Sequence, residues 1–92
     1  MVVIVLEKAP DSLRGYLTRW LIQPRRGVYL GHATARVRER LWSQIRSKIK
    51  SGNAIMIWPD RTCPQGYRAL QAGKSGTTLE DFDGLLLPFS AI

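Results

Sequence analysis

The sequence predicts an α+β fold in which helices cover one face of a β-sheet. Short runs of β-branched and aliphatic residues alternate along the chain with two segments whose apolar residues recur at helical spacing. No repeat or low-complexity tract divides the 92 residues, of which 45% are hydrophobic and 23% charged. These values are ordinary for a folded domain, so we expect one domain over residues 1–92. Because its core would be small, we also expect an oligomer.

The N-terminal part predicts a strand, a helix and a second strand. Residues 2–6 form an unbroken aliphatic run, which is typical of a central strand buried on both faces. Asp11 or Ser12 can cap the helix that follows, and Pro24 ends it. A short strand over residues 28–30 comes next, between two glycines. The stripe with which the helix would pack on the sheet consists of Leu13, Tyr16, Leu17, Trp20 and Leu21.

A second helix is expected from Thr34, which can cap it, to about Lys50. Arg38 projects near the apolar face of this helix. We therefore expect its aliphatic part to pack on the core, while its guanidinium stays free and reaches toward the preceding loop. The apolar face itself has residues at four-residue steps: Val37, Leu41, Ile45 and Ile49.

Three strands are expected in the C-terminal part. Residues 54–58 predict a buried strand and residues 67–71 a peripheral one. Residues 85–89 form an apolar tail in which Pro88 favours an edge position. The tryptophans lie in core-like patterns, so we expect them to pack rather than to stack on bases: Trp20, Trp42 and Trp58.

The net charge is concentrated in one region. Residues 23–50 contain eight of the fourteen Lys and Arg but only one of the seven acids, Glu39, so this region alone accounts for the net charge of +7. Elsewhere basic and acidic groups cancel. A positive field focused in this way, with a sequence pI of about 10.3, favours a polyanionic partner such as a nucleic acid.

Several other classes of protein are disfavoured. The apolar runs are too short to span a bilayer, and the apolar face of the second helix is needed for the core, so we expect no membrane partner. One cysteine, Cys63, and one histidine, His32, cannot build a zinc site without other ligands. A cytoplasmic location fits these features.

Longer stretches resemble a known family. They are VVIVLEKAPDSLRGYLTRWLIQPRRGVYLGHATARVRERLWSQI, then GNAIMIWPD, then DFDGLLLPF. In this order they resemble the small CRISPR-associated Cas-two family in its type I-E form. The resemblance implies a ferredoxin-like (βαββαβ) sandwich with an extra C-terminal strand, in a homodimer that forms through the sheets. It also implies that residues 84–92 are an edge strand pairing with the other subunit or with the partner.

The function implied by the resemblance is that of a scaffold in CRISPR adaptation (spacer acquisition). The dimer would bind double-stranded protospacer DNA through its phosphates and bridge the integrase Cas-one for integration into the CRISPR array, without a required cofactor. By position, the family's duplex contacts fall on Arg14, Arg36 and Arg38, and a further basic position falls on Arg25. The tail would bind the integrase through Leu85, Leu86, Leu87 and Phe89.

The sequence departs from the family pattern where four arginines would be expected. Those positions hold Ser12, Tyr16, Gly76 and Thr77. The candidate substitutes for the missing cations are Arg26, Arg68 and Lys74.

An enzymatic alternative stays open, because some relatives are metal-dependent nucleases that use an acid at the end of the first strand. Glu7 occupies that place. In a symmetric dimer two such carboxylates could face each other and hold one Mg²⁺, which makes Glu7 the candidate catalytic and metal-binding residue of an endonuclease acting on RNA or DNA. Glu7 is longer than the aspartate typical of the nuclease-type relatives.

Overall fold

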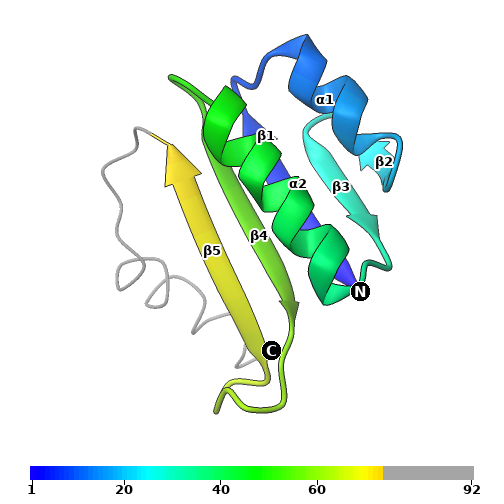
Figure 1. Ribbon diagram of the computed structural model, residues 1–92, viewed down its shortest axis with the longest axis vertical. Coiled ribbons are helices and arrows are strands. Elements are labelled where there is room, and N and C mark those ends of the chain that lie inside the picture. Colours follow the sequence, from blue (N-terminus) through cyan, green and yellow to red (C-terminus); the bar gives the residue numbers. More distant parts are fainter. Residues whose placement is uncertain (74–92) are drawn as a thin grey trace.

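The computed structural model of the chain describes residues 1–73 (Figure 1). Three sequence-based expectations lie outside the described residues. They are the tail strand over residues 84–92 with its partner-binding candidates Leu85, Leu86, Leu87 and Phe89, the substitute cation Lys74, and the departures at Gly76 and Thr77.

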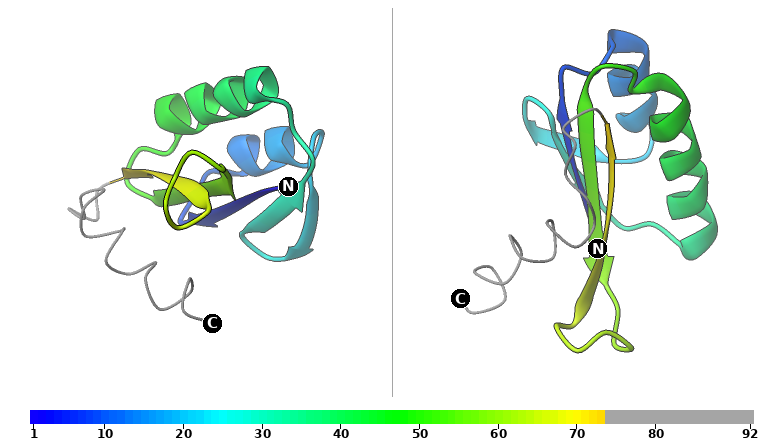
Figure 2. Two further views of the ribbon diagram at one scale, coloured as in Figure 1. Left: turned by 90° about the horizontal axis from the view of Figure 1, so that it is seen from below. Right: turned by 90° about the vertical axis from the view of Figure 1, so that its left-hand side faces the viewer.

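Residues 1–73 form a five-stranded antiparallel sheet with two helices on one face, which confirms the expected α+β architecture (Figure 2). The strand order is β2-β3-β1-β4-β5. This order is compatible with a ferredoxin-like fold in which β5 is an added edge strand. Along the chain the elements are β1 Val2–Glu7, α1 Asp11–Leu17, β2 Ile22–Arg25, β3 Val28–Gly31, α2 Ala35–Lys48, β4 Asn53–Pro59 and β5 Tyr67–Gly73.

The core lies between the helices and the sheet. Strand β1 is central, as predicted, but it is buried on one face rather than two, because alternate side chains point to opposite faces and only one face carries helices. Val3 and Val5 are therefore half-buried on the other face, which we call the open face. The fully buried side chains on the helix side include Val2, Ile4, Leu13, Leu17, Tyr29, Leu41, Ile45 and Met56.

Helix α1 is shorter than predicted. It ends at Leu17, whose carbonyl accepts hydrogen bonds from the N–H groups of Trp20 and Leu21 in a turn. The chain then enters β2, where the predicted helix should have continued. Pro24 disfavours the helical conformation of Gln23, the residue before it. Because β2 is an edge strand, it tolerates a proline, which has no N–H to donate. Leu21 is buried as expected, but Trp20 is 41% exposed, so its assignment to the core is wrong.

Helix α2 agrees with its prediction to within two residues. Thr34 caps it, since the Thr34 Oγ1 accepts a hydrogen bond of 3.2 Å from the Val37 N–H. Leu41, Ile45 and Ile49 are buried, and Val37 is half-buried. The apolar stripe therefore fixes which side of α2 meets the sheet, and its basic side chains lie elsewhere on the helix.

Gly27 lies in the β2–β3 turn and forms a backbone hydrogen bond with the end of β1. Its φ is +82°, and its carbonyl accepts a hydrogen bond of 2.7 Å from the Leu6 N–H. A Cβ at this position would lie 2.7 Å from the Leu6 carbonyl oxygen. The turn that carries Arg25 and Arg26 therefore depends on a residue without a side chain.

Replacing Gly27 by alanine is expected to lower the free energy of unfolding by about 3 kcal/mol, from the left-handed conformation and the backbone clash together. Gly66 is the matched control, because its φ is +90° but a Cβ there would meet nothing within 4 Å. Gly66→Ala should cost only the conformational part, about 1 kcal/mol. Urea denaturation of both variants measures the difference, and equal losses would show that the Leu6 contact does not matter.

Candidate nucleic-acid interface

Most cations of residues 1–73 have no acidic partner. The one ion pair among these residues joins Arg68 to Asp60. Arg36, Arg40 and Arg46 are exposed on α2, and none of them forms an ion pair within the described part of the chain. Their charge is therefore available to an external anion.

Arg38 is held in a defined position. It is half-buried in the first turns of α2, with the centre of its guanidinium 4.7 Å from the centroid of the Trp58 ring. Its Nη1 donates a hydrogen bond of 3.5 Å to the Ala33 carbonyl, in the loop that precedes the helix. The predicted direction is confirmed, but the head is not free. The contact with the Trp58 ring holds the guanidinium in place, and its remaining N–H groups can still donate hydrogen bonds.

Arg14 is also half-buried, on α1, and its Nε is buried; Tyr29 on β3 is fully buried on the same side of the sheet. Burial raises the pKa of Tyr29, and the positive charges of Arg14 and Arg26 act in the opposite direction. Both arginines therefore act electrostatically on the same hydroxyl, although one comes from α1 and the other from the β2–β3 turn. Arg26 is exposed at that turn.

The predicted contacts do not form one pocket. Helix α1 follows the end of β1, whereas α2 follows the end of the antiparallel β3, so α1 and the first turn of α2 lie toward opposite ends of the helix layer (Figure 1). Arg14 is on α1 and Arg36 is in the first turn of α2. Such a spacing suits phosphates that are separated along a nucleic acid backbone.

Arg25 lies on the other side of the sheet. It pairs in register with Val28, and Val28 pairs with Val5, so all three share the open face. The structure therefore separates Arg25 from Arg14, Arg36 and Arg38, with which the sequence grouped it.

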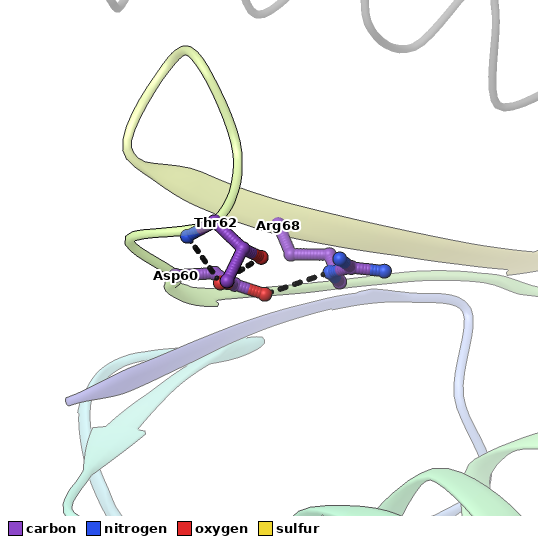
Figure 3. Close-up of polar contacts among 3 residues, drawn as sticks. All are labelled: Asp60, Thr62 and Arg68. Atoms are coloured by element: carbon purple, nitrogen blue, oxygen red, sulfur yellow. Dashed lines mark hydrogen bonds and ion pairs between the residues drawn. The ribbon is translucent and has the colours of Figure 1, made fainter.

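Arg68 forms an ion pair with Asp60, which lies in the β4–β5 turn (Figure 3). Its Nε donates a hydrogen bond of 2.9 Å to Asp60 Oδ2, while the backbone N–H and the Oγ1 of Thr62 donate to Asp60 Oδ1 at 2.9 and 2.6 Å. The bonds from Thr62, and then the one from Arg68, hold the pKa of Asp60 below its usual range. Because Asp60 is thus kept charged beside it, Arg68 is a weaker candidate substitute for a missing arginine than Arg26.

Glu7 stands exposed at the end of β1, opposite Asn53 of β4 and on the open face. The Asn53 Oδ1 is buried and accepts no hydrogen bond. The Asn53 Oδ1 lies toward Gly73 of β5, on the side of β4 away from Glu7, so of these two residues only Glu7 presents an exposed oxygen to a Mg²⁺ ion, which takes about six ligands, several of them water. Within residues 1–73 no three His, Cys, Asp or Glu side chains gather as a metal site.

Sequence reasoning missed two supporting residues. Trp58 packs against the core, as predicted, but it also carries the Arg38 guanidinium. Tyr29 lies in a predicted strand, yet its full burial follows from the packing of the helices on the sheet and not from spacing along the chain.

Fold and charge together define a class: small, basic α+β proteins whose antiparallel sheet carries helices on one face and unpaired arginines above it. The model of a CRISPR-associated protein family (Cas_Cas2CT1978) matches residues 1–87, and the chain therefore belongs to this family of Cas2 proteins. The match confirms the resemblance to the Cas-two family and with it a CRISPR-associated role. The type I-E form stays a prediction. Neither helix of residues 1–73 has the length and apolar character needed to cross a bilayer.

Proposed function

We propose that this chain is a scaffold for spacer acquisition, whose dimer binds duplex DNA through phosphate contacts and bridges the subunits of the integrase Cas-one. The observation that carries the proposal is the set of arginines on and beside the helix layer without acidic partners within residues 1–73. Arginines on rigid elements bind phosphates without reading bases. A scaffold that must accept any captured sequence needs this kind of contact.

The open face supports the dimer. It presents two neighbouring half-buried pairs at the centre of the sheet, where Val3 is opposite Ile57 and Val5 is opposite Ile55. A second, small hydrophobic cluster around Ala69 continues the same face toward β5. An apolar sheet face without a helix layer is the kind of surface that a second copy of the chain would cover.

Duplex binding by the native protein is expected to be independent of sequence and steeply dependent on salt. If Arg14, Arg36 and Arg38 of both subunits contact phosphates, the slope of log affinity against log salt should be about −5 or steeper. Fluorescence anisotropy with two duplexes of unrelated sequence measures both properties. A flat salt titration, or a strong preference for one duplex, would contradict the proposal.

The bridging role is tested by co-purification with Cas-one on a DNA duplex. We expect a complex with the full chain and none after deletion of residues 84–92, which would carry the partner-binding residues. An intact complex after this deletion would exclude the tail as the segment that binds Cas-one. The salt titration would still test duplex binding separately.

A second candidate function is a Mg²⁺-dependent nuclease. It is favoured by the exposed position of Glu7 on the open face, where two copies of the chain could bring both carboxylates together. A bound Mg²⁺ would orient a water molecule and neutralise charge on a phosphate. The nuclease requires Glu7→Gln to abolish metal-dependent cleavage of RNA or DNA, whereas the scaffold requires the same variant to support integration at the native level.

A further inference from the structure

A hollow lies between α2 and the last two strands of the described chain, on the helix side of the sheet. Strand β5 extends the sheet beyond the helices, so its helix-facing side chains are only partly covered. The hollow has a volume of about 290 Å³, near the lower end of the range for small-molecule sites, about 300–1,000 Å³. A helix with its side chains is about 10–12 Å wide, so the hollow suits a small molecule or one unit of a polymer better than a helix of a partner.

The floor of the hollow consists of two cross-strand pairs. Trp58 pairs in register with Arg68, and Met56 pairs with Leu70 on the same face of the sheet. The wall is one stripe of α2 at helical spacing, within residues 35–42. Because α2 and β4 run in opposite directions, the start of the helix lies against the end of the strand (Figure 1).

The two ends of the hollow differ in chemistry. Two guanidinium groups are held beside Trp58: that of Arg38 is centred 4.7 Å from the centroid of its ring, and that of Arg68 is bonded through Nε to Asp60 (Figure 3). The other end lies two residues away along β4, or about 7 Å. It is apolar and is formed by Trp42, Met56 and Leu70.

We propose that this hollow binds an unpaired nucleotide, with its phosphate at Arg38 and Arg68 and its base against Trp42. Guanidinium groups bind phosphate by charge-assisted hydrogen bonds, and an aromatic ring stacks on any base. One sugar separates a base from its 5′-phosphate and spans the distance between the two ends. An anion alone would leave the apolar end uncovered, and an apolar ligand would leave the two cations unused.

The acid at the rim fits the same ligand. Glu39 lines the hollow, is exposed, and forms no ion pair with Arg38 or Arg68. Its carboxylate repels a phosphate but accepts hydrogen bonds from the N–H groups of a base. The whole site lies within one chain, so the inference does not rest on the proposed function.

The first test adds AMP to the native protein and follows the indole N–H resonance of Trp42, assigned by its absence in Trp42→Phe. We expect a saturable shift with a dissociation constant on the order of 1 mM. Adenosine, which lacks the phosphate, and inorganic phosphate, which lacks the base, should each bind more weakly by about fivefold or more. The absence of a shift with AMP, or equal binding of either fragment, would overturn the proposal.

The second test changes the two cations. Arg38→Gln and Arg68→Gln should each weaken AMP binding about fivefold. Arg40→Gln is the matched control, because Arg40 is exposed on the same helix and does not line the hollow, and it should lose less than about twofold. Equal losses in all three variants would show that AMP follows the general positive charge, and that result would refute the site.

A competition experiment distinguishes the two sources of the nucleotide. Displacement of AMP by a short single-stranded oligonucleotide would identify an unpaired nucleotide of a strand as the ligand. Bound AMP that the oligonucleotide does not displace would identify a free nucleotide. Either result supports the site once the first test has succeeded. The proposed function is judged by the duplex titration, and its failure would leave the AMP result unaffected.

Discussion

Replacing Arg14, Arg36 and Arg38 together by glutamine is expected to weaken duplex binding about 100-fold at physiological salt. In a dimer the change removes six phosphate contacts, and exposed contacts of this kind contribute a factor of about two to three each. The salt slope should fall in magnitude by about five units, since each lost phosphate contact removes about 0.9. Fluorescence anisotropy over a range of salt concentrations measures both quantities.

The matched control removes the same number of charges elsewhere. Lys8, Lys50 and Arg61 are exposed and form no ion pair within residues 1–73, so their combined change to glutamine lowers the net charge equally. We expect the control to lose less than about tenfold in affinity, because only the general field is reduced. Equal losses of affinity in the two triple variants would show that the net charge alone binds the DNA and that Arg14, Arg36 and Arg38 make no specific contribution.

If the proposed dimer forms through the open face, replacing Ile55 by lysine is expected to convert it into a monomer. Ile55 lies beside Val5 at the centre of the open face, and both side chains are half-buried in one chain. A dimer that covers this face would bury the new ammonium group without a partner, at a cost of several kcal/mol. In a single chain, the long lysine side chain can reach water. Light scattering coupled to size-exclusion chromatography measures the change in mass.

Two further variants distinguish loss of the dimer from misfolding of the chain. Val5→Lys should also give a monomer, whereas Ser43→Lys, at an exposed position on α2, should remain dimeric. Circular dichroism should show folded protein in all three. A dimer that survives both open-face substitutions would place the subunit contact on another surface.

The fold could be predicted as far as local patterns determine it. The Thr34 cap and the four-residue apolar steps identified α2, and the aliphatic run at the N-terminus identified the central strand. The predicted first helix was too long because Trp20 and Leu21 continue the apolar spacing of α1. In the structure only Leu21 of these two residues packs in the core. A turn that follows a helix preserves such spacing over a few residues, so periodicity alone does not show where the helix ends.

The candidate interface was predicted by residue type but not by environment. Arg14 is not among the residues of the apolar stripe predicted for its helix, yet its Nε is buried. Arg68 was considered as a substitute cation, but it is paired with Asp60 across the β4–β5 turn. These contacts join residues from different elements, and no spacing along the chain encodes them.

The sequence by itself determined the α+β class, the surplus of cations in residues 23–50 and the membership of a CRISPR-associated family, because composition, periodicity and motif order are local properties of the chain. Only the tertiary structure decided that Arg25 faces away from Arg14, that Arg38 rests on Trp58 and that the Tyr29 hydroxyl is buried. The physical reason is that strand register and helix packing bring distant residues together, and these depend on the whole core at once.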